Sequence, residues 1–117
     1  MKKTVLRVGV ILAAIVVVVI GGYLQISADA ERLPENRPEV FLAQPAAKPG
    51  ARVVVCAGDS LTPGAVSVNY VELLGRTFRD GGYEFVNAGV NSSLAYNLNR
   101  RLEDIIRCDP DYVTILI

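Results

Sequence analysis

The hydrophobic and polar positions divide this chain of 117 residues into three stretches with different patterns. Residues 8–26 contain a continuous apolar run, Val8 to Leu24, that is interrupted only by glycines. Residues 27–51 hold four of the six prolines and show little hydrophobic periodicity. From Arg52 onward, short apolar runs alternate with amphipathic segments, which is the pattern of strands alternating with helices.

The first stretch has the length of a membrane-spanning helix. As a helix, the run from Val8 to Leu24 spans about 26 Å, which is close to the ~30 Å hydrocarbon core of a bilayer. Basic residues lie in segment 1–7, so this segment is expected in the cytoplasm and the rest of the chain outside. We interpret 8–26 as a retained signal anchor. A signal peptide cleaved near Ala30, followed by secretion, and a buried soluble helix remain as alternatives.

The second stretch, 27–51, is interpreted as a proline-rich linker. Its prolines and its lack of periodicity favour an extended chain. At ~3.1 Å per residue, such a linker would hold a folded domain up to about 75 Å from the membrane.

The third stretch, 52–117, predicts two βα units and a third strand. Val53 to Ala57 and Glu84 to Val86 are the first two strands, and Tyr112 to Ile117 is the third. The apolar spacing predicts a helix from Tyr70 to Phe78, closed by Gly81-Gly82, and a second helix capped by Ser92 or Ser93 and stopped by Asp109-Pro110. The apolar stripe of that second helix comprises Leu94, Leu98, Leu102, Ile105 and Ile106, with Arg100, Arg101, Glu103 and Asp104 largely opposite.

Two loops of this βαβαβ order carry candidate chemistry. The loops after parallel strands meet at the carboxyl edge of the sheet, where ligands bind in open α/β folds. Ser60 follows the first strand directly, which is a suitable position for a nucleophile. Asp59 is a poor candidate for its base because it is adjacent in sequence, and the chain contains no histidine. The remaining polar loop residues that enter the candidate site are Asn87, Asn91 and Ser92.

Charge and cysteine usage exclude several other classes of function. The formal net charge is zero and there is no basic patch interleaved with aromatic residues, which argues against nucleic-acid binding. Cys56 and Cys108 are expected more than ~10 Å apart, so a disulfide is the less favoured reading. Two isolated cysteines do not make a zinc site, and neither a P-loop nor G-x-G-x-x-G occurs.

Three blocks resemble the SGNH, or GDSL-type, hydrolase family over Arg52 to Ile117. The blocks are Gly58-Asp59-Ser60-Leu61, Asn87-Ala88-Gly89-Val90-Asn91-Ser92 and Pro110 to Ile117. The resemblance implies a flavodoxin-like three-layer α/β/α domain of strand order 2-1-3-4-5, here only its first βαβαβ portion. It also implies ester hydrolysis through a serine acyl-enzyme without metal or organic cofactor.

The resemblance also assigns roles to residues. Ser60 would be the nucleophile and would supply one oxyanion-hole amide. Ser92 would supply the second amide, with Gly89 as the weaker choice, and Gly58, Asp59, Asn87 and Asn91 would support the loops. Ser92 stands where the family has glycine, so a positive φ at this residue would be strained. The third-block asparagine and the Asp-x-x-His segment with the base are expected beyond Ile117.

The sequence therefore predicts the amino-terminal part of a membrane-anchored serine esterase, with little turnover from these residues alone. Esters of lipids, thioesters, acetylated polysaccharides and peptidoglycan all remain compatible substrates. The alternative function is a catalytically inactive, membrane-tethered flavodoxin-like binding module. Phosphate or nucleotide in the loop after the first strand would be its ligand.

Overall fold

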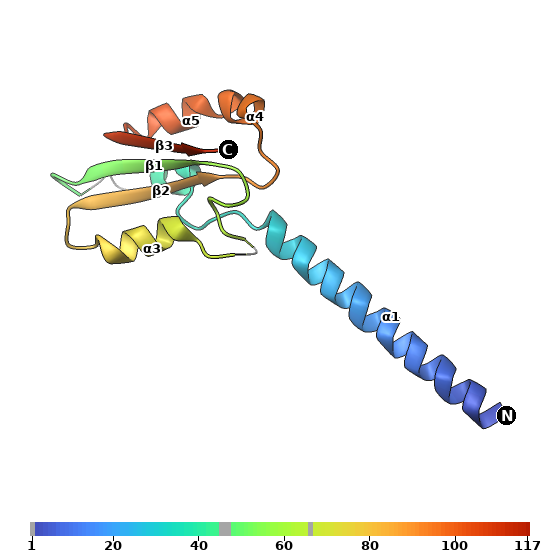
Figure 1. Cartoon of the computed structure of the whole chain (residues 1–117). Coiled ribbons are helices and arrows are strands. Elements are labelled where there is room, and N and C mark those ends of the chain that lie inside the picture. The colour runs from blue at the N-terminus through green and yellow to red at the C-terminus, as the bar shows by residue number, and fades with distance from the viewer. Residues whose placement is uncertain (1, 45–47, 66) are drawn as a thin grey trace.

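The computed structural model describes residues 2–44, 48–65 and 67–117, and it combines a long helix with a small α/β unit (Figure 1). Helix α1 (Lys2–Glu31) projects from the α/β unit, so the molecule measures 75 × 33 × 23 Å. The other elements follow in the order α2 (Pro38–Leu42), β1 (Arg52–Gly58), α3 (Tyr70–Thr77), β2 (Tyr83–Gly89), α4 (Ala95–Arg100), α5 (Leu102–Arg107) and β3 (Tyr112–Leu116).

Helix α1 confirms the apolar segment at the amino terminus as a helix. Leu6–Glu31 has a mean hydropathy of 2.5 and none of its most apolar window is buried against the rest of the chain. Its valines and isoleucines from Val8 to Ile26 are exposed on all sides of the helix, as Val18 is with 73% of its surface exposed. The helix is long and apolar enough to cross a membrane or to be a signal sequence.

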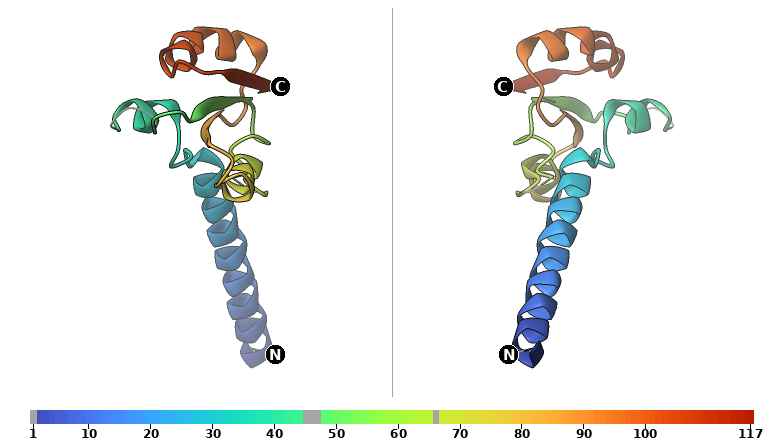
Figure 2. Two further views of the ribbon diagram at one scale, coloured as in Figure 1. Left: turned by 90° about the vertical axis from the view of Figure 1, so that its left-hand side faces the viewer. Right: turned by 90° about the vertical axis from the view of Figure 1, so that its right-hand side faces the viewer.

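The three strands form one parallel sheet in the order β2-β1-β3. Val54 of β1 lies between Phe85 of β2 and Tyr112 of β3. Helix α3 lies on one face of the sheet and α4 and α5 lie on the other, as Figure 1 and both views of Figure 2 show. A mixed α/β arrangement with a parallel sheet is therefore confirmed.

Strand β1 forms the centre of two apolar clusters because its side chains alternate between the faces of the sheet. Val53, Val55 and Ala57 pack with Leu98 of α4 and Ile105 of α5. Cys56 packs with Val71 on the α3 face, whereas Cys108 belongs to the opposite cluster. Both cysteines are buried and free, and the sheet separates them, so no disulfide joins them.

The second amphipathic segment differs from its prediction as one continuous helix. It is divided into α4 and α5 at Arg101, where φ is −104°. The first helix starts after Leu94, and neither Ser92 nor Ser93 caps it; instead, the Leu94 amide donates to Asn97 Oδ1. Of the predicted apolar stripe, Leu98 and Ile105 are buried, whereas the other three members are exposed: Leu94, Leu102 and Ile106. Each of the two short helices therefore buries one member of the stripe against the sheet, Leu98 from α4 and Ile105 from α5.

The segment predicted as an extended linker is largely folded onto the domain. Helix α1 continues to Glu31, and α2 packs against α5 and β2. Pro34 is buried, and the side-chain amide of Asn36 donates to Phe85 O at 3.0 Å. The prolines reduce the conformational entropy that this segment loses on folding. The apolar contacts of α2 and the backbone hydrogen bond to β2 outweigh the loss that remains. Residues 45–47 of the predicted linker lie outside the described residues.

Candidate functional site

The candidate site lies at the carboxyl edge of the sheet, where β1 and β2 end side by side. Gly58 and Gly89 are register partners, and the Val90 amide donates to Gly58 O at 3.1 Å. On the other side of β1, the Asp59 amide donates to Leu116 O at 3.1 Å, so β3 ends next to the same loop. The loops after β1 and β2 therefore leave the sheet from adjacent points, as the sequence predicts.

The loop after β1 is a tight turn around Asp59. Asp59 Oδ1 accepts from the Leu61 amide at 3.0 Å, and Asp59 O accepts from the Thr62 amide at 3.2 Å. The Asp59 carboxylate thus points into its own turn, where it is poorly placed to act as a base for Ser60. Ser60 is half-buried in this turn, and no hydrogen bond within the described part of the chain occupies its hydroxyl or its amide.

Thr62 packs between the two strand ends and explains both glycines. Its side chain is fully buried, and a Cβ on Gly58 would lie 2.2 Å from Thr62 Oγ1 and 2.2 Å from Leu116 O. A Cβ on Gly89 would lie 2.3 Å from Pro63 Cδ and 2.6 Å from Thr62 Cβ. The role of Thr62 was not predicted from the sequence, although a glycine at the end of two successive strands is a signal of such close packing.

The side chain of Asn87, on β2, anchors the Ser60 loop through a hydrogen bond to its backbone. Its buried side-chain amide donates to Thr62 O at 3.2 Å and to Asn69 Oδ1 at 3.1 Å, and Asn69 in turn caps α3. Asn87 Oδ1 accepts from the Gly89 amide at 3.1 Å. Asn87 is therefore a positioning residue. The amide of Gly89, the weaker choice as an oxyanion donor, is therefore already engaged in a hydrogen bond.

The loop after β2 presents unengaged amides at a strained residue. The amides of Asn91 and Ser92 have no hydrogen-bond acceptor within residues 2–44, 48–65 and 67–117. Ser92 adopts φ +57°, the left-handed region that glycine occupies without cost. A serine thus adopts a backbone conformation that favours glycine, at a cost of about 1 kcal/mol.

Arg101 holds this second loop from the junction of α4 and α5. Its guanidinium donates to Ala88 O and to Ser93 Oγ, both at 2.9 Å. Burial lowers the pKa of Arg101, whereas Glu39 and Asp104 raise it, and the side chain remains charged at neutral pH. The helical pattern predicted Arg101 on the solvent side, and the break between the helices turns it toward the sheet instead.

Two cavities flank the loops. A cavity of about 330 Å³ is lined by Ala30 to Leu33 on one side and by Pro63 and Gly89 to Ser92 on the other. A wider one of about 740 Å³ extends from Asp29 and Arg32 along α3. Ser60 itself lines neither of these two cavities, although Pro63 of the same loop lines both. No three His, Cys, Asp or Glu side chains gather as metal ligands in the part of the chain that the structure describes.

This arrangement offers a hydroxyl and backbone donors but no histidine. The amides of Ser60, Asn91 and Ser92 are available to an oxygen that becomes negatively charged, which is the requirement of an oxyanion hole. Comparison with known proteins adds no relative: no family model, no curated protein and no solved structure matches this chain.

Proposed function

We propose that residues 52–117 belong to a flavodoxin-like serine ester hydrolase of the SGNH, or GDSL-type, family, with Ser60 as its nucleophile. One observation carries the proposal. Ser60 follows the central strand of a parallel sheet with its hydroxyl and amide both unengaged, and the loop with the unengaged amides of Asn91 and Ser92 leaves the neighbouring strand β2 at the same edge. The strand order β2-β1-β3 is compatible with the first part of the order that the resemblance implies.

The reaction would proceed in two steps at Ser60. The Ser60 oxygen attacks the ester carbonyl carbon, its proton passes to a base, and the carbonyl oxygen becomes an oxyanion that the free amides stabilise. The bond to the alcohol then breaks, and the alcohol leaves with a proton. Water attacks the acyl-enzyme, which releases the carboxylic acid and restores the hydroxyl.

We assign the base and one further oxyanion donor to sequence outside residues 1–117. The printed chain contains no histidine, and the resemblance implies an Asp-x-x-His segment and a third-block asparagine in later sequence. The carboxyl end of β3 adjoins the Ser60 turn through the 3.1 Å hydrogen bond from Asp59 to Leu116, so chain that follows β3 is well placed to reach Ser60. The proposal extends to a retained α1 anchor with residues 1–7 in the cytoplasm and the domain outside.

The test is active-site labelling of the full-length protein that contains these residues. A fluorophosphonate is expected to label Ser60, and Ser60→Ala should abolish both labelling and hydrolysis of p-nitrophenyl butyrate while leaving urea unfolding unchanged. Ser67→Ala is the matched control, because Ser67 is an exposed serine of the same loop, and it should keep full labelling. Residues 1–117 alone should show little turnover.

Three results would contradict the proposal or a part of it. A fluorophosphonate that leaves Ser60 unlabelled in the full-length protein would remove the nucleophile. A phosphate-dependent rise in melting temperature, lost on Ser60→Ala, would favour the binding module instead. A clear hydrolysis rate from residues 1–117, abolished by Ser60→Ala, would overturn the assignment of the base to other sequence.

A further inference from the structure

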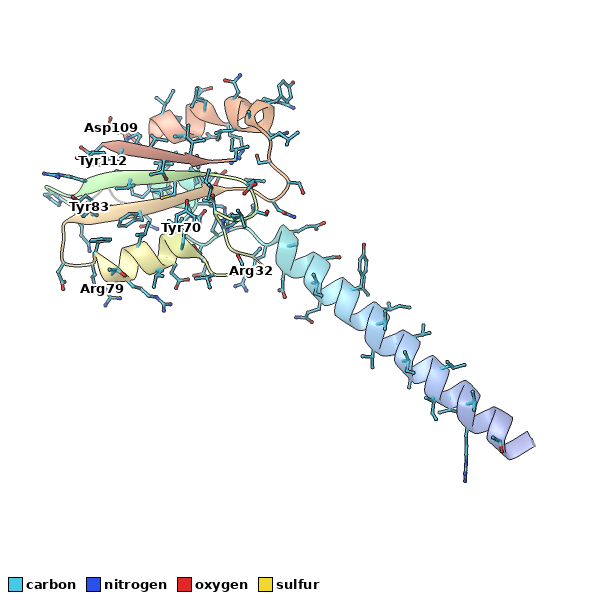
Figure 3. The ribbon with its side chains drawn as sticks, in the orientation of Figure 1. Arg32, Tyr70, Arg79, Tyr83, Asp109 and Tyr112 are labelled. Atoms are coloured by element: carbon cyan, nitrogen blue, oxygen red, sulfur yellow. The ribbon has the colours of Figure 1, made fainter. Side chains whose placement is uncertain are left out.

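The carboxyl edge of the sheet is the edge that faces α1. Tyr83 and Tyr112 begin β2 and β3, and both lie at the end of the sheet remote from α1, whereas Arg32 lies where α1 meets the domain (Figure 3). The strands therefore run toward the helix. The loops that carry Ser60 and Ser92 lie on its side of the domain (Figure 1).

The last turn of α1 lies against these loops. Ala30 to Leu33 form one wall of the 330 Å³ cavity whose other wall contains Gly89 to Ser92. Asp29 and Arg32 line the 740 Å³ cavity together with Pro63 to Ala65 of the Ser60 loop. Residues at the end of α1 and residues of the candidate-site loops therefore line the same two cavities.

The connection between α1 and the domain leaves little slack. Only Arg32 and Leu33 separate the end of α1 from the buried Pro34. Asn36 then makes two hydrogen bonds with β2, from its side chain to Phe85 O at 3.0 Å and from the Asn87 amide to its own carbonyl oxygen at 2.9 Å. Residues 27–31, which follow the anchor segment 8–26, add only ~7.5 Å of helix, about the depth of one headgroup layer. A domain on this connection lies at the bilayer surface, well inside the ~75 Å reach of an extended linker.

Apolar side chains on this edge suit a membrane surface better than water. Leu33 is 51% exposed, Leu61 is 56% exposed and Val68 is 70% exposed. Leu61 and Val68 come from the Ser60 loop, and Leu33 follows α1 directly. Transfer of such side chains from water to the interfacial region is favourable in proportion to their apolar area.

We infer that the substrate is an ester of a membrane-embedded molecule, presented to Ser60 at the bilayer surface. This inference rests on the proposed hydrolase function and on retention of α1. A polysaccharide ester in solution would have to enter the narrow space between the bilayer and the edge that carries Ser60. A molecule held in the bilayer reaches that edge by lateral diffusion.

A spacer in α1 tests the inference. A flexible Gly/Ser insert of about 20 residues between Ile26 and Ser27 would allow the domain to move ~25 Å from the surface while residues 27–33 stay with it. In the full-length protein in phosphatidylcholine vesicles, hydrolysis of vesicle-embedded diacylglycerol should fall about tenfold. The reason is that the spacer lowers the effective concentration of the Ser60 site at the bilayer surface. Hydrolysis of water-soluble p-nitrophenyl butyrate by the same variant should not change.

A fluorescent probe tests the orientation without catalysis. Val68→Cys places an NBD label on the edge that faces α1, and Asp80→Cys places it on the exposed α3–β2 connection at the opposite edge. Spin-labelled headgroup lipids should quench the label at 68 strongly and the label at 80 weakly. Cys56 and Cys108 are expected to escape labelling, because both are buried and burial raises the pKa of each thiol.

The outcomes separate this inference from the proposed function. Equal quenching at positions 68 and 80, or an insert that leaves hydrolysis of the embedded ester unchanged, would overturn the inference of a membrane substrate. Labelling of Ser60 in the same protein would still support the hydrolase function. The same result would favour a soluble ester, such as an acetylated polysaccharide. A Ser60 that is not labelled in the full-length protein overturns both.

Discussion

The two loops at the carboxyl edge are built in different ways. The loop after β1 is held by short side chains packed into the sheet itself: Thr62 lies against two glycines, and Asn87 binds its backbone from below. The loop after β2 is held from a distance by Arg101, and it contains a serine with positive φ. The first loop is therefore fixed by close packing, while the second is fixed by two charge-assisted hydrogen bonds and keeps local strain.

This difference suits the roles that we propose for the two loops. A nucleophile has to be held within a few tenths of an ångström, which dense packing achieves. Backbone donors need only a fixed direction, which the guanidinium of Arg101 provides through Ala88 and Ser93. Changes to the packed loop should therefore cost more stability than changes to the second loop.

The largest effect is expected where a methyl group is added between the loops. Gly89→Ala would bring Cβ within 2.3 Å of Pro63 and should destabilise the domain by about 3 kcal/mol, because the backbone of the Ser60 loop must shift. Urea unfolding in detergent micelles, followed by near-ultraviolet circular dichroism, measures this. Gly75→Ala is the control: its nearest atom would be Phe85 Cδ2 at 4.0 Å, and it should stabilise α3 by ~0.5–1 kcal/mol. Equal effects of both changes would refute close packing at Gly89.

Removal of the support beneath the Ser60 loop should cost slightly less. Asn87→Ala leaves Thr62 O and the Gly89 amide without their buried partner and should destabilise the domain by about 2–3 kcal/mol. Fluorophosphonate labelling of Ser60 in the full-length protein should also slow. Asn99→Ala changes an exposed asparagine of α4 and should stay within ~0.5 kcal/mol. Unfolding that is the same for both variants would contradict the role of Asn87.

The second loop should respond to loss of its distant support. Arg101→Ala removes the hydrogen bonds to Ala88 O and Ser93 Oγ and should destabilise the domain by about 1.5–2 kcal/mol. Hydrogen exchange of the amides at positions 91 to 93 should accelerate, while exchange in the Ser60 loop should change little. Arg100→Ala is the neighbouring control and should leave both measurements unaltered, because its side chain is exposed. Exchange that accelerates equally in both loops would contradict separate support.

The smallest effect should have the opposite sign. Ser92→Gly relieves the positive φ of +57° and should stabilise the chain by about 0.5 kcal/mol, since the added entropy of the unfolded glycine offsets part of the gain. The amide donor is retained, so labelling of Ser60 should persist. Ser93→Gly provides the contrast: it removes the buried hydroxyl that binds Arg101 and should destabilise. A destabilising Ser92→Gly would mean that the serine side chain makes a contact that offsets its strain.

Local patterns were sufficient to predict the strands and the position of Ser60. Apolar runs such as Val53 to Ala57 read as strands because a central parallel strand is covered on both faces, and each was predicted within three residues of its observed end. Ser60 then follows from chain order alone. The second helix was less predictable: its spacing is continuous, and only contact with the sheet turns Arg101 inward and breaks it there.

An apolar amino-terminal helix, an alternation of strands and helices, and two polar loops after successive strands could all be predicted from the amino-acid order, because these properties depend on neighbours along the chain. Tertiary structure alone decided that the supposed linker packs on the domain, that the Gly89 amide is occupied and that the carboxyl edge faces α1. These facts depend on contacts between residues distant in sequence. The periodicity of hydrophobic residues carries no information about such contacts.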